Sequence, residues 1–158
     1  IFTIKLKNFM QIFIGGIGCF WDETEYQGVA GIISTECGYC GGKNPKVTYE
    51  QVCGGNTEHI EVVKVTFDPK IISYEDITRL FFKIHDPTTL NRQGPNVGYQ
   101  YRSEIFYNTE EEKKSAQKVL DEVNKKFNGK VVTTIRKEKN YCKAEEYHQK
   151  YFEKQKKR

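Results

Sequence analysis

The chain has 158 residues, of which 37% are hydrophobic and 29% charged, and its formal net charge is +4. This length fits a single domain with a sizeable core, and the 13% of aromatic residues argues against a disordered chain. No uncharged apolar run approaches the ~20 residues of a membrane-spanning helix, which excludes a protein that crosses a bilayer in that way.

The N-terminal part of the chain is predicted to alternate strands with a helix and glycine turns. Residues 10–15 form an apolar strand that runs into a glycine turn. A helix is expected over residues 20–29, beginning at Cys19, because the acidic residues of its first turn suit the positive end of the helix dipole. Residues 32–39 form a second strand, and the glycine-rich residues 41–46 form a loop.

The middle of the chain is predicted to form a strand, a helix and a long loop. Apolar residues alternate over residues 60–67, which indicates a strand. Ser73 is the expected N-cap of a helix, and the Asp-Pro pair at residues 86–87 stops that helix. The polar residues 88–100 form a long loop. The apolar stripe of the helix consists of Ile77, Leu80, Phe81 and Ile84.

The last third of the chain completes the expected fold class. Residues 102–107 and 131–135 are predicted strands, and a capping box of Thr109 and Glu112 begins the clearest helix between them. A terminal helix is expected over residues 144–157. Strands that alternate with helices predict an α/β (α+β) fold, arranged as a two-layer sandwich.

The chain shows no repeat or low-complexity linker, so residues 10–158 are predicted to form one domain. Residues 1–9 are interpreted as a leader or a remnant from upstream of a natural start at Met10. We interpret the basic C-terminus as a solvated helix end and expect a monomer that binds neither nucleic acid nor membranes. The basic residues of this end are Lys154, Lys156, Lys157 and Arg158.

The five cysteines are an odd number, whereas a secreted disulfide scaffold more often has an even set in a shorter chain. One or more thiols are therefore expected to stay free. Free thiols favour a reducing compartment, and we predict a cytoplasmic protein.

The first motif that carries chemistry is the run Gly-Cys-Phe-Trp at residues 18–21. A glycine turn that feeds a helix would place Cys19 at the helix N-terminus, where the dipole and free N–H groups stabilise the reactive thiolate. Phe20 and Trp21 could wall an apolar pocket beside the sulfur. A buried structural cysteine followed by core aromatics is an equally good interpretation of these residues alone.

Two further motifs combine loops with polar side chains. Glu61 follows a glycine loop at the start of a predicted strand, where its carboxyl could act as a general acid if burial raised its pKa. Tyr101 offers a hydroxyl at the end of the long loop, and long loops within compact domains are usually functional. An ordinary strand-end glutamate and a core tyrosine are the structural alternatives.

A zinc site is a competing interpretation, because Cys37, Cys40, Cys53 and His59 are ligand types that zinc accepts. However, only Cys37 and Cys40 form a tight pair, so we expect no metal and no other cofactor. The same pair is typical of thioredoxin-like redox chemistry, but no βαβ pattern frames it.

Seven sequence blocks together resemble the peptide-methionine (S)-S-oxide reductases, the A-type methionine sulfoxide reductase (MsrA) family. The resemblance runs from about Met10 to Phe152, nearly the whole chain, and implies a two-layer α/β, ferredoxin-like plait with long coil segments. The blocks, in order, are GCFW (18–21), GYCGG (38–42), TYEQVC (48–53), HIEVV (59–63), HDPTTLNRQG (85–94), QYRS (100–103) and AEEYHQKYF (144–152).

The resemblance implies a role for each matching residue. Cys19 matches the family nucleophile, and Glu61 matches its proton donor. Phe20 and Trp21 match the aromatic residues that hold the S-methyl group of the substrate. The tyrosines that hydrogen-bond around the sulfoxide oxygen correspond to Tyr49 and Tyr101.

Three departures from the family pattern bear on the site. Asn96 stands where the family often has aspartate, which keeps hydrogen bonding at this substrate-binding position but removes a carboxylate. Asp22 replaces a frequent glycine, and the helix behind it is one residue shorter. Glu58, before His59, also stands where glycine is usual.

The resemblance implies a thiol mechanism for the reduction of methionine sulfoxide, free or in proteins. Attack by Cys19 on the sulfoxide sulfur of the S epimer leaves a Cys19 sulfenic acid, which a second thiol converts to a disulfide. A thioredoxin-like reductant restores the dithiol. Cys142 is the expected resolving cysteine, since an exposed, mobile stretch before the last helix could carry it to Cys19. Cys40 in the glycine loop is the alternative, whereas Cys53 and Cys37 are expected to be buried.

Two other function classes stay open at this stage. The first is a cysteine hydrolase in which Cys19 is paired with His59, His85 or His148. The second is a zinc-binding or basic interaction module without catalytic activity. Turnover of an ester or amide would favour the first, and stoichiometric zinc would favour the second.

Overall fold

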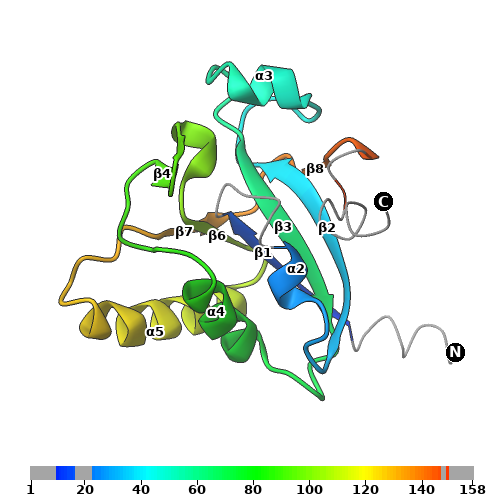
Figure 1. The fold of residues 1–158 in the computed structure, drawn as a ribbon. Helices are drawn as coiled ribbons and strands as arrows, with labels where there is room; N and C mark the ends of the chain where they lie inside the picture. The colour runs from blue at the N-terminus through cyan, green and yellow to red at the C-terminus, as the bar shows by residue number, and fades with distance from the viewer. Residues whose placement is uncertain (1–9, 17–22, 147–148, 150–158) are drawn as a thin grey trace, which may run out of the picture.

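The computed structural model describes residues 10–16, 23–146 and 149, and within them a mixed sheet runs through the molecule (Figure 1). Six strands lie in the order β7-β6-β1-β3-β2-β8; β6 and β7 are parallel, and the other neighbours are antiparallel. The predicted α/β class is thereby confirmed. The strands are β1 (Gln11–Gly16), β2 (Ile32–Cys40), β3 (Ile60–Phe67), β6 (Glu104–Tyr107), β7 (Thr134–Lys137) and β8 (Cys142–Lys143).

The remaining described elements connect these strands. The helices are α2 (Glu23–Tyr26), α3 (Tyr49–Cys53), α4 (Tyr74–Lys83) and α5 (Glu110–Lys126). A small hairpin of β4 (Arg92–Gln93) and β5 (Asn96–Val97) precedes a 3₁₀ turn, η2 (Tyr99–Tyr101).

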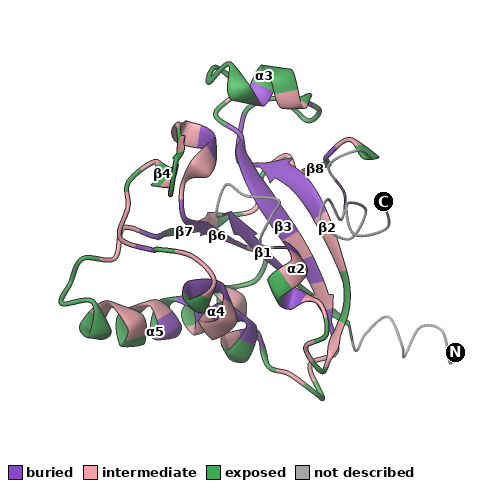
Figure 2. Cartoon of the chain, viewed as in Figure 1, coloured by how far each residue is buried: buried purple, intermediate pink, exposed green. Residues whose placement is uncertain are grey.

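The largest core cluster lies between one face of the sheet and helices α4 and α5 (Figure 2). Side chains alternate along β3, so that Val63, Val65 and Phe67 enter this core together. Phe13 of β1 meets Phe81 of α4 edge to face, with ring centroids 5.6 Å apart. The predicted apolar stripe of α4 is confirmed, because its residues either belong to this cluster or pack against it.

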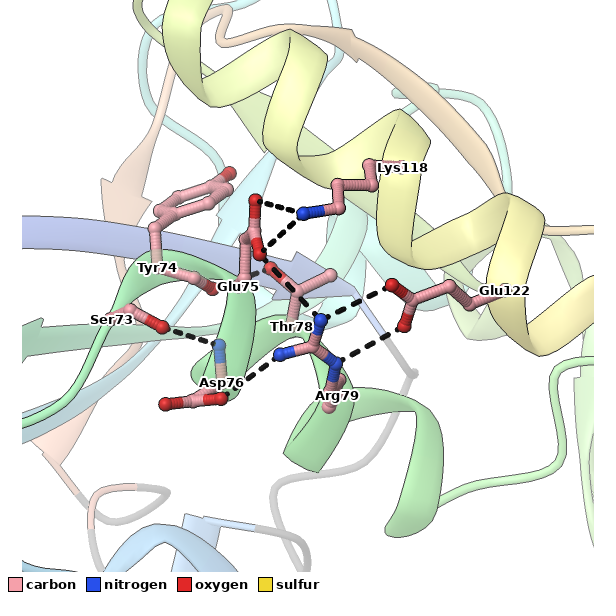
Figure 3. Close-up of polar contacts among 8 residues, drawn as sticks. All are labelled: Ser73, Tyr74, Glu75, Asp76, Thr78, Arg79, Lys118 and Glu122. Carbon is pink, nitrogen blue, oxygen red and sulfur yellow. Dashed lines mark hydrogen bonds and ion pairs between the residues drawn. The ribbon is translucent and has the colours of Figure 1, made fainter.

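Exposed ion pairs join α4 to α5 outside this core (Figure 3). The Arg79 guanidinium donates to both carboxylate oxygens of Glu122, each at 3.2 Å, and to Asp76 at 3.0 Å. Lys118 of α5 pairs with Glu75 of α4 at 3.3 Å. Because such pairs remain hydrated, they orient the helices more than they stabilise them.

The predicted helix starts of α4 and α5 are confirmed in detail. The Ser73 hydroxyl accepts from the Asp76 N–H at 3.0 Å. Thr109 and Glu112 form the predicted reciprocal capping box. At the end of α5, Asn128 adopts a left-handed conformation with φ of 56°, which is typical of a helix end.

Several predicted boundaries are wrong for reasons of tertiary contact. Helix α2 ends at Tyr26, and its predicted first residues lie outside the described ones. The strand predicted over residues 131–135 corresponds to β7, which begins at Thr134, since the backbone N–H groups of Val131 and Val132 donate to Asn124 and Pro87. The predicted long loop contains the β4–β5 hairpin, and α3 and β8 were not expected at all.

The predicted terminal helix also starts differently. Ala144 lies outside any helix, because its N–H donates to the Cys37 carbonyl at 2.9 Å and extends the pairing of β8 with β2. Most residues of the predicted helix lie outside the described ones. Within the described ranges, no helix combines the length and apolar character that spanning a membrane requires.

Candidate active site

Glu61 is the second residue of β3, as the sequence predicts, and its side chain is buried. Only 3% of the residue is exposed, and in the described part of the chain its Oε2 atom has no hydrogen-bond partner. Burial raises the pKa of Glu61 from 4.5 to about 8. This carboxyl therefore carries its proton at neutral pH, as a general acid must.

Tyr49 begins α3, which lies at the end of the sheet where β3 starts (Figure 1). A capping box of Thr48 and Gln51 fixes the start of this short helix. The side chain of Cys53, one turn later, lies beside the Tyr49 hydroxyl. This neighbour, burial and the nearby Tyr101 and Glu61 groups together raise the pKa of Tyr49.

Tyr101 ends the η2 turn, next to β3. Burial raises its pKa, and the nearby Glu61 and Cys53 groups raise it further. Tyr101 also lies beside Tyr49. The structure thus brings Glu61, Tyr49 and Tyr101 together from three separate parts of the sequence.

The predicted nucleophile Cys19 and its neighbours Phe20 and Trp21 lie outside the described residues. The last described residue before them is Gly16, which is paired with Val62 of β3 and with Glu104 of β6. Strand β1 therefore ends opposite Val62, the residue that follows Glu61 in β3.

Cys142 does not lie in the exposed, mobile stretch that we expected. It is half-buried in β8, opposite Tyr39 at the edge of the sheet, because the chain runs from β7 past the end of β2, where the Gly41 N–H donates to the Lys139 carbonyl, and then pairs with β2. Its thiol donates to the Val47 carbonyl at 3.9 Å. It packs, with Tyr49, against a small cluster of buried residues: Cys37, Tyr39, Val47, Val52 and Ala144.

Cys40 ends strand β2 and does not lie in the glycine loop as predicted. It is fully buried, and its thiol donates to the Lys139 carbonyl at 3.4 Å. Burial raises the pKa of Cys40 to about 12. Since the thiolate is the reactive form, this environment keeps Cys40 unreactive.

The prediction of a buried Cys53 is wrong, whereas that of a buried Cys37 is confirmed. Cys53 is exposed at the end of α3, because this short helix stands clear of the sheet at its last turn (Figure 2). The contact between Cys53 and Tyr49 was not predicted from the sequence, although residues four apart share a helix face. The Cys37 thiol donates to the buried Glu23 carboxylate at 3.5 Å.

Two departures from the family pattern can be located. Glu58 has a φ of 61°, in the left-handed region where glycine is favoured, which explains why glycine is usual there. Asn96 lies in β5 of the hairpin that precedes η2. In the described part of the chain it makes no hydrogen bond to Glu61, Tyr49 or Tyr101.

The zinc alternative finds no matching geometry among the described residues, whereas Cys19 and His148 of the hydrolase alternative lie outside them. Cys37 and Cys40 contribute to different clusters on opposite faces of β2. Within the same ranges, no three His, Cys, Asp or Glu side chains gather as metal ligands would. His85 donates from Nδ1 to the Phe81 carbonyl at 2.5 Å and accepts at Nε2 from Ser103 at 2.7 Å, so both ring nitrogens are occupied.

Comparison with known proteins decides between the remaining interpretations. The family model described as peptide methionine sulfoxide reductase matches residues 10–158. The chain belongs to the peptide methionine sulfoxide reductase family. A methionine sulfoxide reductase MsrA of Pelagibacter ubique is 58% identical over 146 residues, which cover 92% of this chain and 99% of that protein. The resemblance inferred from the seven sequence blocks is thereby confirmed.

Solved structures of methionine sulfoxide reductases have the same fold. The reduced form of Mxr1 from Saccharomyces cerevisiae superposes with a TM-score of 0.89 and 36% identity, over 96% of this chain and 88% of that one. Mxr1 in complex with Trx2 matches with a TM-score of 0.67 and 27% identity, over 89% of this chain and 85% of that one. This chain therefore shares its overall fold with Mxr1.

Proposed function

We propose that this chain reduces the S epimer of methionine sulfoxide, free or in proteins, with Cys19 as nucleophile and Glu61 as proton donor. The observation that carries the proposal is the buried Glu61 carboxyl, protonated at neutral pH and adjacent to Tyr49 and Tyr101. Cys19 follows Gly16 by three residues, and Gly16 is paired next to Glu61 along β3. Membership of the family supports the same assignment.

Reduction of the sulfoxide to methionine needs only one thiol, that of Cys19. The Cys19 thiolate attacks the sulfoxide sulfur and forms a transient S–S bond while Glu61 protonates the oxygen. The resulting hydroxyl group then moves to the Cys19 sulfur, the S–O and S–S bonds to the substrate sulfur break, and methionine leaves with Cys19 as a sulfenic acid. Tyr49 and Tyr101 hydrogen-bond the departing oxygen, with Asn96 at the rim of the substrate site. Phe20 and Trp21 hold the S-methyl group of the substrate.

We assign the resolving step to Cys142, whose thiol forms a disulfide with Cys19 and releases water. Half-burial in a two-residue edge strand makes Cys142 easier to release than Cys40, which is fully buried with a pKa of about 12. A thioredoxin-like dithiol then reduces the disulfide by exchange. The match to Mxr1 in complex with Trx2 supports this partner.

We also infer the fold type, the domain bounds and the cellular compartment of the protein. The elements β1, α2, β2, β3, α4 and β6 follow the βαββαβ order, and their strands lie as β6-β1-β3-β2, which supports a ferredoxin-like plait. Residues 10–158 form one domain, the range that the family model matches. The four described cysteines are free thiols, which supports a reducing, cytoplasmic compartment.

The reaction should be stereospecific, and this tests the proposed function most directly. We expect turnover of the S epimer and none of the R epimer, because the methyl pocket fixes the methyl group, the tyrosine hydroxyls fix the oxygen, and the position of Cys19 fixes the side from which the sulfur is attacked. Chiral chromatography of methionine sulfoxide after incubation with dithiothreitol measures both epimers in one sample. Equal rates on the two epimers would contradict the Phe20–Trp21 pocket.

Cys142→Ser should separate reduction from recycling. The variant should release about one methionine per enzyme without reductant, since Cys19 chemistry precedes resolution. Small dithiols should sustain its turnover, whereas thioredoxin should do so poorly. Cys40→Ser is the control and should retain turnover with thioredoxin.

Mass spectrometry of the enzyme after oxidation by substrate identifies the resolving cysteine directly. A peptide in which Cys19 is linked to Cys142 is expected. A link from Cys19 to Cys40 or to Cys53, with Cys142 still a free thiol, would transfer the role to that residue.

A further inference from the structure

One carboxylate joins the segment that carries Cys142 to the candidate active site. Glu145 Oε2 accepts a hydrogen bond from the Tyr49 backbone N–H at 3.1 Å. Its other oxygen, Oε1, accepts from the Tyr39 hydroxyl, also at 3.1 Å. Tyr39 is fully buried in β2. Glu145 thus spans from the edge of the sheet to the first residue of α3.

The position of Glu145 is set by the pairing of β8 with β2. Cys142 and Lys143 form β8, and the Ala144 N–H continues the pairing by donating to the Cys37 carbonyl. The Gln149 side chain then accepts from the Cys37 N–H and donates to the Cys37 carbonyl, both at 2.8 Å. Glu145 is therefore held on both sides by bonds to a single residue of β2.

Helix α3 depends on contacts of this kind because it has only five residues. So short a helix is not stable alone, and its first N–H groups lack partners within the helix. The Thr48 hydroxyl satisfies the Gln51 N–H, and Glu145 satisfies the Tyr49 N–H. A negative charge is also favourable at this end of a helix. These two hydrogen bonds fix the start of the helix and therefore the direction of the Tyr49 side chain.

We propose that Glu145 is a positioning residue, which holds Tyr49 against the sulfoxide oxygen while Cys142 is seated in β8. The inference rests on the role proposed above for Tyr49. The proposal links reduction of the sulfoxide with formation of the disulfide, because Glu145 follows Cys142 by three residues. When β8 separates from β2 to release Cys142, Glu145 loses its hydrogen bond to Tyr49. Reduction of the sulfoxide is then most efficient in the form of the enzyme whose resolving thiol is still in its strand.

A double-mutant cycle tests this proposal, with the rate of methionine release in a single turnover as the measurement. Glu145→Ala and Tyr49→Phe should each slow this step about three- to tenfold, the range that one hydrogen bond contributes. The double variant should be no slower than Tyr49→Phe alone, because Glu145 acts through the Tyr49 hydroxyl. Glu145→Gln keeps one oxygen acceptor and should recover part of the rate.

Glu146→Ala is the matched control, since Glu146 is an exposed neighbour that pairs with Lys143 at 3.5 Å; its rate should equal that of the wild type. Rates are normalised to the folded fraction, measured by circular dichroism. If Glu145→Ala slows the Tyr49→Phe enzyme as much as it slows the wild type, Glu145 does not act through Tyr49 and the proposal is overturned. A wild-type rate for Glu145→Ala overturns it equally. A wild-type rate for Tyr49→Phe alone would instead refute the role of Tyr49 in the proposed function.

Discussion

Cys19→Ser should abolish methionine sulfoxide reduction with every reductant, thioredoxin and small dithiols alike. A serine hydroxyl is a far weaker nucleophile toward sulfur than a thiolate at neutral pH. The substitution removes the first chemical step, so no methionine should form even in a single turnover without reductant. Chromatographic measurement of released methionine at stoichiometric enzyme checks this result.

The matched control for Cys19→Ser is Cys142→Ser, which makes the same chemical change at another thiol. That variant should still release about one methionine per enzyme. If Cys19→Ser keeps substantial activity in the same assay, another of the five cysteines is the nucleophile and the assignment is lost. A normal melting temperature for both variants would show that the difference is chemical.

Glu61→Gln should slow reduction about 10²- to 10⁴-fold, the usual contribution of a general acid. Glutamine keeps the shape of the side chain but has no proton of suitable acidity to give to the sulfoxide oxygen. In the wild type the acid form disappears above a pKa of about 8. The wild-type rate of proton transfer should therefore fall as pH rises through about 8, and this decline should be absent from the residual activity of Glu61→Gln.

The same substitution should raise stability, with a definite pH dependence. In the unfolded chain Glu61 ionises near pH 4.5, whereas in the folded chain it stays protonated until about pH 8. The folded state therefore binds more protons between these values, and the wild type loses stability as pH rises through this window. The stability advantage of Glu61→Gln should be absent below pH 4.5 and grow up to about pH 8.

Denaturant unfolding at several pH values measures this trend. Glu58→Gln serves as the control, because Glu58 is exposed and three residues away; its stability difference and its rate should vary little. A Glu61→Gln variant with a near-normal rate and reduced stability would mark Glu61 as an ordinary structural residue at the end of a strand.

Much of the fold follows from short-range patterns in the sequence. The alternation over residues 60–67 corresponds to β3 residue for residue. The capping signals at Ser73 and Thr109 mark the starts of α4 and α5. These elements were predictable because their periodicity and their first-turn hydrogen bonds involve residues only a few positions apart.

The short elements were not predictable, because each depends on a distant partner. Helix α3 rests on the bond from Tyr49 to Glu145, which lies 96 positions away along the chain. Strand β8 exists only through its pairing with β2. An isolated five-residue helix or two-residue strand is not stable, so no local sequence pattern predicts it.

By itself the sequence determined the family, the α/β class and the identities of Glu61, Tyr49 and Tyr101 as site candidates. Only the tertiary structure decided their chemical state. Glu61 is protonated at neutral pH because segments far apart in the chain exclude water around it. Likewise, Cys40, expected in the glycine loop, is buried at the end of β2, and Cys53, expected to be buried, is exposed. Burial of a charged or reactive group depends on every element packed around it, and the free energy of ionisation follows from that burial.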